Sequence, residues 1–256
     1  MSLPDLFSLN GRVALVTGAG GGLGRECAEA VAEAGGDVAC ADLNGEAARQ
    51  TATAVEKHGR RSTIIACDVT DERQVADMVS TTVREFGRLD VVFNNAGVAD
   101  NPPAKAHHMS AESWHRVINV DLNGVFYTAR EALRVMVAQG GGKIINIASM
   151  WGTAGSSSIV PMPGYTAAKG AVVNLSRELG LEYATEGIQV NALCPGFYRT
   201  EFGEYGNPEF LATLSSFTPM GRVAAASEIR GPALFLASAA SAGMTAQTLI
   251  IDGGLL

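Results

Sequence analysis

A tyrosine and a lysine four residues apart, Tyr165 and Lys169, are the side chains best suited to proton transfer in this sequence. They fall in a segment of helical period, Tyr165–Thr185, so both project from one helix face. A free phenol, with a pKa near ~10, is a poor base at neutral pH, but a neighbouring ammonium lowers that pKa. The pair is therefore suited to take a proton from an alcohol or to return one to a ketone. Such a pair is also common on helix surfaces, so this prediction depends on the surrounding motifs.

Ser149 is the serine expected beside this pair. It follows the apolar segment Lys143–Ala148, at the carboxyl edge of a predicted parallel strand, where ligands bind in open α/β sheets. There its hydroxyl is placed to hold and polarise a substrate oxygen. Nucleophilic catalysis is not expected, because the sequence has no G-x-S-x-G turn and no histidine after Tyr165. The alternative serines fall in a predicted loop: Ser156, Ser157 and Ser158.

A glycine cluster follows the predicted strand Arg12–Thr17. Residues 17–24 read Thr-Gly-Ala-Gly-Gly-Gly-Leu-Gly, and helical period begins at once. Glycine lets the backbone approach a pyrophosphate closely, and the free N–H groups of the new helix stabilise its charge. An ordinary strand-to-helix turn is the alternative, but a dinucleotide fold holds its phosphates at this first junction. The residues expected to contact a dinucleotide are Gly18, Gly21, Gly22 and Leu23.

The second predicted strand, Asp37–Asp42, ends in a carboxylate that favours NAD over NADP. Asp42 lies 18 residues beyond Gly24, where a carboxylate accepts both hydroxyls of the adenosine ribose and repels a 2′-phosphate. No arginine or lysine lies in the glycine loop before Gly24 or directly after Asp42. The alternative role for Asp42 is to cap a turn.

Strand-like and helix-like segments alternate along the whole chain. The predicted strands are Arg12–Thr17, Asp37–Asp42, Thr63–Ala66, Leu89–Asn94, Lys143–Ala148, Ile188–Cys194 and Thr248–Asp252. The predicted helices are Gly22–Ala34, Glu46–Lys57, Asp71–Phe86, Ser113–Ala138, Tyr165–Thr185 and Ser227–Ala237. This alternation predicts an α/β fold with a single doubly wound, Rossmann-type parallel sheet of about seven strands. Residues 1–256 are expected to form one domain, with a substrate loop at about 197–221 and a polar loop at 100–109.

Composition excludes several other classes of protein. Hydrophobic residues make up 47% and charged residues 18%, which permits a large core. The net charge of −7, without a basic stripe, argues against nucleic acid as a partner. No apolar stretch is long enough to span a membrane, and residues 1–10 do not resemble a signal peptide. The histidines lack metal-ligand spacing, so no catalytic metal is expected. Scattered cysteines predict reduced thiols in a cytoplasmic protein: Cys27, Cys40, Cys67 and Cys194.

Taken together, the motifs resemble the short-chain dehydrogenase/reductase family over nearly the whole chain. The spacing T-G-x-x-x-G-x-G at residues 17–24 is the one these enzymes use. Tyr165 and Lys169 match their Y-x-x-x-K motif, with Ser149 upstream. Further matching segments are Cys67-Asp68-Val69, Asn94-Asn95-Ala96-Gly97, Pro195-Gly196 with Thr200, and Ile251-Asp252-Gly253-Gly254. Each motif alone is common, but all of them in this order are specific.

The resemblance implies an NAD-dependent oxidoreductase that moves a hydride between nicotinamide and a secondary alcohol or ketone. It also implies that Lys169 bonds the nicotinamide ribose. A homo-oligomer, usually a tetramer, is expected, with the helices beginning near Ser113 and Tyr165 at one interface. The cofactor contacts that the resemblance adds are Leu43, Asp68, Val69, Asn95, Ala96, Gly97, Tyr165, Lys169, Pro195, Gly196, Tyr198 and Thr200.

The sequence departs from the family pattern at Asp121. Many members carry an asparagine at the start of N-L-x-G-V-F, whereas residues 121–126 read Asp-Leu-Asn-Gly-Val-Phe. Asp121 falls on the apolar stripe of the predicted helix Ser113–Ala138, where a carboxylate is costly unless paired. It is either a water-organising group in a proton relay with Lys169 or a structural group bonded to nearby backbone or a partner subunit. The stripe consists of Trp114, Val117, Ile118, Leu122, Val125 and Phe126.

Aromatic and methionine side chains are expected to line the substrate site. The candidate walls are Met150, Trp151, Met162, Phe197, Tyr198, Phe202, Tyr205, Phe210 and Phe217. The substrate contacts expected from these and the motif residues are Ser149, Trp151, Tyr165, Phe197 and Phe202. Such walls favour a cyclic or medium-sized, mainly apolar substrate. The alternatives are a 3-oxoacyl reductase, a sugar-acid or polyol dehydrogenase, and, in another class, a catalytically silent NAD-sensing scaffold.

Overall fold

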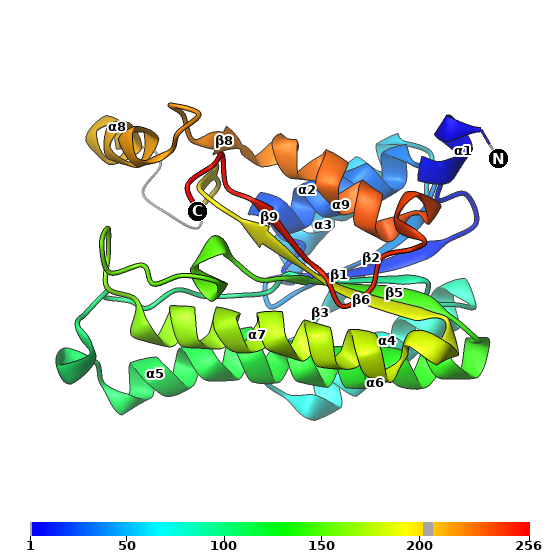
Figure 1. Cartoon of the computed structure of the whole chain (residues 1–256). Coiled ribbons are helices and arrows are strands. Elements are labelled where there is room, and N and C mark those ends of the chain that lie inside the picture. Colours follow the sequence, from blue (N-terminus) through cyan, green and yellow to red (C-terminus); the bar gives the residue numbers. More distant parts are fainter. Residues whose placement is uncertain (1, 202–206) are drawn as a thin grey trace.

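Seven parallel strands form the central sheet of the computed structural model, which describes residues 2–201 and 207–256. The strands are β1 Val13–Thr17, β2 Asp37–Asp42, β3 Ser62–Ala66, β4 Val91–Asn94, β5 Gly142–Ile147, β6 Ile188–Pro195 and β9 Thr248–Ile251. Their order in space is β3-β2-β1-β4-β5-β6-β9 (Figure 1). This confirms the predicted doubly wound, Rossmann-type α/β fold.

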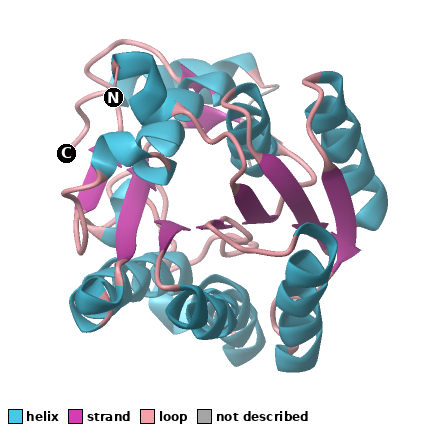
Figure 2. Ribbon diagram, turned by 90° about the vertical axis from the view of Figure 1, so that its right-hand side faces the viewer, coloured by secondary structure: helices cyan, strands magenta, loops and turns pink. Residues whose placement is uncertain are grey.

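Helices cover both faces of the sheet, as Figure 2 shows. The helices are α1 Leu3–Phe7, α2 Gly22–Glu33, α3 Gly45–Lys57, α4 Glu72–Phe86, α5 Ala111–Ile118, α6 Gly124–Gln139, α7 Pro163–Glu182, α8 Pro208–Phe217 and α9 Arg230–Ala237. One core lies between the sheet and α2, α3 and α9, and a second lies under α4, α6 and α7. All five residues of β1 are buried, because the strand is covered on both sides.

The crevice that can receive a ligand follows from the strand order. From β1 the chain crosses over to β2 and then β3, whereas from β4 it crosses to β5 and then β6 on the other side. The crossovers therefore diverge between β1 and β4, which are neighbours in the sheet. In open α/β sheets this divergence opens a crevice at the carboxyl ends of the strands.

The predicted helix over Ser113–Ala138 is helical throughout, but its period changes in the middle. The segment consists of α5, a π-helical turn at Asn119–Asn123, and α6. The wider turn changes which side chains share a face, so a stripe with a constant period does not continue through it. Trp114 and Phe126, expected on the buried stripe, are 38% and 41% exposed, whereas Val117 and Val125 are buried.

The predicted loop at 197–221 contains regular structure that the sequence analysis missed. The short strand β7, Tyr198–Arg199, pairs with β8, Ala224–Ala225. The helix α8 follows the undescribed residues and is capped by Asn207, whose Oδ1 accepts hydrogen bonds from two backbone N–H groups. An asparagine before a proline at the first helical position is a helix-start signal.

Candidate active site

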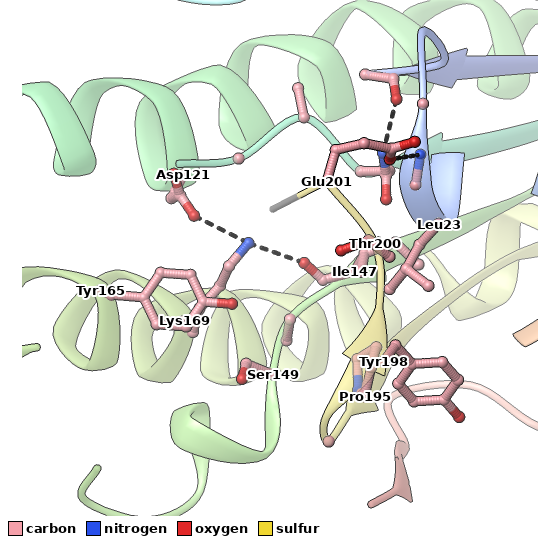
Figure 3. Close-up of a pocket in the computed structure, with 18 of the residues that line it drawn as sticks. Leu23, Asp121, Ile147, Ser149, Tyr165, Lys169, Pro195, Tyr198, Thr200 and Glu201 are labelled. Carbon is pink, nitrogen blue, oxygen red and sulfur yellow. Dashed lines mark hydrogen bonds and ion pairs between the residues drawn. The ribbon is translucent and has the colours of Figure 1, made fainter. Parts of the chain in front are cut away.

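A pocket of about 370 Å³ opens at the carboxyl ends of β1, β4, β5 and β6. Figure 3 shows Tyr165, Lys169 and Ser149 together, with Asp121 and Glu201 nearby. The residues that line the pocket are Gly18, Gly21, Gly22, Leu23, Asp42, Asn95, Ala96, Gly97, Asp121, Ile147, Ala148, Ser149, Tyr165, Lys169, Pro195, Gly196, Tyr198, Thr200 and Glu201. The structure thus brings most of the predicted site residues to one place.

The glycine loop packs closely against the segment after β4. A Cβ atom at Gly24 would overlap the carbonyl oxygen of Gly18 and lie 2.5 Å from Asn95 Nδ2. Gly18 itself has a φ of +64°, in the left-handed region that favours glycine. The Asn95 side chain donates hydrogen bonds to the carbonyl oxygens of Thr17 and Gly18, at 3.1 and 3.0 Å. These contacts fix the turn that leads into α2.

A carboxylate already occupies the start of α2. Glu201 Oε2 accepts a hydrogen bond of 3.1 Å from the backbone N–H of Gly22 (Figure 3). A helix N-terminus with free N–H groups binds anions, including the phosphates of nucleotides. The contact shows that this turn accommodates an anion, so the residues present fit a dinucleotide diphosphate. No local sequence pattern predicts Glu201 at this position, because Gly22 and Glu201 are 179 positions apart in the chain.

Asp42 is held at the end of β2 by two backbone N–H groups. Oδ2 accepts a hydrogen bond from Gly20 and Oδ1 accepts one from Asn44, each at 2.8 Å. The carboxylate therefore caps a turn and also lines the pocket. The guanidinium of Arg25 donates hydrogen bonds to the carbonyl oxygen of Gly20, whose N–H bonds Asp42, and to the hydroxyl of Thr51.

Lys169 is buried between three groups of the site. Its Nζ donates a 3.0 Å hydrogen bond to the carbonyl oxygen of Ile147 and forms an ion pair of 3.1 Å with Asp121 Oδ2. The same nitrogen lies 5.6 Å from the centre of the Tyr165 ring. The Tyr165 hydroxyl shares a side-chain hydrogen bond with Ser149, whose Oγ also accepts from the backbone N–H of Trp151. The ammonium, phenol and serine hydroxyl are thus adjacent.

The pKa values of this cluster reflect burial and mutual charge. Burial raises the pKa of Tyr165, while the Lys169 ammonium and the Ser149 hydrogen bond oppose the shift; the pKa remains above its usual value. The expectation of a lowered tyrosine pKa is therefore wrong for the protein by itself. Burial lowers the pKa of Lys169, but Asp121, Tyr165 and Cys194 together outweigh burial and hold that pKa above its usual value. Lys169 is consequently cationic at neutral pH.

The contacts of Asp121 fit both roles expected for it, the structural one and the one that acts with Lys169. It is completely buried in the π-helical turn, and Oδ1 accepts a 2.7 Å hydrogen bond from the backbone N–H of Val98. Burial holds the pKa of Asp121 above its usual value, although Lys169 and the Val98 N–H act to lower it. Asn119 is exposed and bonds Asn123. Asp121 therefore joins a structural backbone contact to the electrostatics of Lys169.

Several predicted contacts lie outside the pocket lining. Leu43 is 75% exposed, Asp68 bonds Thr70 next to it, and Val69 packs against Gly124. Two predicted substrate contacts, Trp151 and Phe197, also lie outside the pocket lining. Trp151 is buried and meets Phe197 edge to face, with ring centres 6.2 Å apart. Of the candidate walls, Phe217 is 44% exposed. The predicted contact Phe202 and the candidate wall Tyr205 lie outside the described residues.

Within residues 2–201 and 207–256, no group of histidine, cysteine or acidic residues is arranged to hold a metal ion. Over the same residues, no helix is both long and apolar enough to cross a membrane. His107 and His108 are exposed on a short 3-10 turn and stack on each other. The four cysteines are buried and unbridged.

Known proteins resemble this chain over its whole length. A family model described as "Enoyl-(Acyl carrier protein) reductase" matches residues 18–256. Gluconate 5-dehydrogenase of Gluconobacter oxydans is 37% identical, covering 100% of this chain and 98% of the relative. Cis-4-hydroxycyclohexanecarboxylate dehydrogenase of Sinomonas cyclohexanicum is 39% identical, covering 95% and 96%.

Solved structures of dehydrogenases also resemble this chain over nearly its whole length. A short-chain type dehydrogenase/reductase from Mycobacterium marinum superposes with a TM-score of 0.95 at 38% identity, covering 99% of both chains. A gluconate 5-dehydrogenase from Burkholderia cenocepacia, solved with NADP and tartrate, gives 0.92 at 36% identity, covering 99% of this chain and 98% of that one. The chain belongs to the short-chain dehydrogenase/reductase family. It is a nicotinamide-dependent oxidoreductase that acts on CH–OH groups. The enzymatic relatives favour this activity over the alternative of a catalytically silent scaffold.

Proposed function

We propose that the enzyme uses NAD and that Tyr165 exchanges the proton of a secondary alcohol or ketone. The observation that carries this proposal is the convergence of Tyr165, Lys169 and Ser149 in the pocket that also holds the glycine loop. An acid–base group must lie within hydrogen-bond reach of the reacting oxygen, and only a shared pocket permits this.

In the oxidative direction, the Tyr165 phenolate takes the hydroxyl proton of the alcohol. Ser149 donates a hydrogen bond to the substrate oxygen and holds it beside the phenol. Lys169 stabilises the phenolate by its charge and would bond the nicotinamide ribose of a bound cofactor, while Asp121 and the Ile147 carbonyl fix its ammonium. Bound nicotinamide supplies the acceptor for the hydride that leaves the carbinol carbon. Reduction of a ketone reverses each transfer.

The cofactor contacts divide along the pocket. The glycine loop would receive the diphosphate and Asp42 the adenosine ribose. Asn95, Ala96 and Gly97 line the pocket between the glycine loop and Lys169 and would also contact the cofactor. Leu43, Asp68 and Val69 are assigned to the adenine end. The assigned nicotinamide side consists of Pro195, Gly196, Tyr198 and Thr200.

Asp42 supports NAD rather than NADP. Its carboxylate faces the pocket, where it can accept ribose hydroxyls but repels a 2′-phosphate. The Burkholderia cenocepacia gluconate 5-dehydrogenase was solved with NADP, so the preference needs a direct test. Fluorescence titration should give a Kd for NADH at least about 10-fold below that for NADPH, with Asp42→Ser narrowing the gap. Tighter binding of NADPH to the unmodified enzyme would overturn the assignment.

The preferred substrate is a cyclic or medium-sized, mainly apolar secondary alcohol. One relative is named for a hydroxycyclohexane carboxylate, which supports a cyclic substrate. A sugar acid or polyol is the second candidate, supported by the relative named gluconate 5-dehydrogenase. A panel of cyclic alcohols, polyols and sugar acids, followed by NADH absorbance, distinguishes them by kcat/KM.

The acid–base role is tested by Tyr165→Phe. This variant keeps the ring but lacks the proton-carrying oxygen, so kcat should fall by at least about 100-fold while NADH still binds. Undiminished turnover in a folded Tyr165→Phe variant excludes the proposed role of the phenol.

We further propose a homo-oligomer, usually a tetramer in this family, located in the cytoplasm. Phe126 and Val137 on α6 are each 41% exposed. Apolar side chains exposed together in this way support an interface between copies. The buried, unbridged thiols support a reducing compartment.

A further inference from the structure

The helix that carries Tyr165 is capped from outside its own sequence. Met162, the residue before α7, makes no side-chain cap, and the first helical residue is a proline. Instead Asp100, in the segment after β4, accepts hydrogen bonds through Oδ2 from the backbone N–H groups of Gly164 and Tyr165, at 3.0 and 3.4 Å. A remote carboxylate therefore bonds the main chain of the proposed acid–base residue itself.

Asp100 is a buried and restrictive partner. Its exposed fraction is 3%, and Oδ1 has no hydrogen-bond partner among the described residues. A Cβ atom at Gly164 would lie 2.6 Å from Oδ1, so the close approach depends on that glycine. Burial raises the pKa of Asp100, against the two N–H donors and Arg116, which lower it. The free N–H groups and the positive end of the helix dipole favour a carboxylate at this point.

The segment that carries Asp100 is tied to both members of the Tyr–Lys pair. Its Val98 N–H bonds Asp121, which in turn forms the ion pair with Lys169. Arg116 of α5 donates a 2.6 Å hydrogen bond to the carbonyl oxygen of Ala99. Asp100 then completes the connection to the first turn of α7. One short segment thus contacts Lys169 through Asp121 at one end and Tyr165 directly at the other.

We propose that Asp100 is a positioning residue for the reaction: it fixes the first turn of α7 so that the Tyr165 hydroxyl stays against Ser149 and Lys169. The inference rests on the proposed role of Tyr165. A helix begins with free N–H groups and frays without a cap, and Tyr165 lies in that first turn. Because a displacement of about 1 Å at a reacting group can cost roughly 100-fold in rate, loss of this cap is felt in turnover.

The test compares Asp100→Ala with Asp100→Asn, and both with Asp71→Ala. The asparagine keeps an oxygen that can accept the same two hydrogen bonds. Asp71 likewise accepts two backbone hydrogen bonds at the start of α4, a helix that carries no part of the Tyr–Lys pair. For each variant, kcat is measured at saturating alcohol and NAD, the Kd for NADH by fluorescence, and stability by urea unfolding.

Asp100→Ala should lower kcat by about 10- to 100-fold while the Kd for NADH stays within about twofold. Its oxidative pH–rate profile should also move to higher pH, because the Ser149 hydrogen bond that lowers the pKa of Tyr165 is loosened; the other groups acting on the phenol are Lys169, Asp121 and Cys194. Asp100→Asn should recover most of kcat. Asp71→Ala should lose stability with kcat unchanged. Where alanine does not fold, Asp100→Ser serves instead, since its short side chain cannot reach both N–H groups.

Three outcomes overturn the inference. They are a folded Asp100→Ala or Asp100→Ser with kcat within about twofold of the parent, an Asp100→Asn as slow as the truncation, and an Asp71→Ala equally slow at equal loss of stability. The proposed function is judged separately by Tyr165→Phe. If that variant is inactive and Asp100→Ala is unimpaired, only the positioning role fails; if Tyr165→Phe is active, the acid–base assignment fails first.

Discussion

At the scale of single residues, the site is governed by the charge of Lys169 and what surrounds it. Its ammonium lies between the Asp121 carboxylate and the Ile147 carbonyl oxygen, next to the Tyr165 ring. Asp121 keeps the lysine charged inside the protein, yet its own negative charge raises the pKa of Tyr165. If Tyr165 is the proposed base, its ionisation depends on Lys169, on Ser149 and on the positive ring of the bound oxidised nicotinamide cofactor.

Replacing Lys169 by alanine should move the oxidative pH–rate profile to higher pH. The ammonium lowers the pKa of Tyr165, so its loss raises that pKa, and the phenolate forms only in more alkaline solution. NADH should also bind more weakly. The measurement is kcat/KM for alcohol oxidation between neutral and alkaline pH.

A double variant separates this effect from the buried carboxylate left behind. Asp121 without its cation destabilises the fold by about 3–5 kcal/mol, a cost that Lys169→Ala with Asp121→Asn should largely remove. The double variant should therefore regain stability in urea but not turnover. Recovery of turnover together with stability would contradict an electrostatic role for Lys169.

At the scale of elements, the N-terminus of α2 is the point where β7 and the glycine loop meet. Glu201 reaches across from the end of β7 and accepts the hydrogen bond of the Gly22 N–H, where the diphosphate is proposed to lie. Thr200 approaches the same turn, since a Cβ atom at Gly22 would lie 3.3 Å from Thr200 Cβ. Both segments therefore lie where an anion would approach the N-terminus of α2.

Glu201→Gln should bind NADH more tightly. It removes a negative charge that competes with the diphosphate, worth about 1 kcal/mol at close range in a water-like environment, or roughly a fivefold lower Kd. The difference should shrink in high salt, because the repulsion is screened. Glu186→Gln, the same charge change on the exposed turn before β6, is the matched control. Equal Kd values for the two variants would remove Glu201 from cofactor binding.

Gly24→Ala should destabilise the protein by about 1–3 kcal/mol, as overpacked cores do. The new Cβ would overlap the Gly18 carbonyl oxygen, which forces α2 away from β1. Gly231, in α9, has open space around its missing Cβ, so Gly231→Ala should instead stabilise by about 0.5–1 kcal/mol. Urea unfolding of both variants provides the comparison, and equal shifts would contradict the packing argument.

At the scale of the whole molecule, apolar side chains lie exposed on the outer side of α5 and α6. Trp114, Phe126 and Val137 are each more than a third exposed, and Arg130 packs its guanidinium 5.7 Å from the Phe126 ring. Phe126 and Val137 also line a hollow shared with α7. An exposed apolar surface of this kind favours association with another copy.

Phe126→Glu should therefore dissociate the enzyme into smaller species. A carboxylate placed at an apolar interface must be desolvated, which opposes assembly. Sedimentation velocity should show a lower mass for Phe126→Glu than for the parent, with unchanged mass for Leu3→Glu, a control on the exposed face of α1. A parent that is already monomeric would rule out the proposed oligomer.

The sequence by itself determined the sheet, the two sets of helices and the chemical motifs. These are local signals: apolar runs for buried strands, helical period, glycines at a junction, and a Tyr–Lys pair on one helix face. Each depends on residues near one another in the chain. The single-domain organisation over residues 1–256 remains a prediction.

Only the tertiary structure decided which distant groups meet. Glu201 on Gly22, Asp100 on the main chain of Tyr165, and Asp121 on Lys169 are contacts across 179, 65 and 48 positions of sequence (48 from 169 minus 121). The direction of the Tyr165 pKa shift belongs here too, because burial and the Asp121 charge set it. The local sequence determines which chemical groups stand on one helix face or at one strand end. Which charges surround them in a low-dielectric interior depends on how the whole chain folds.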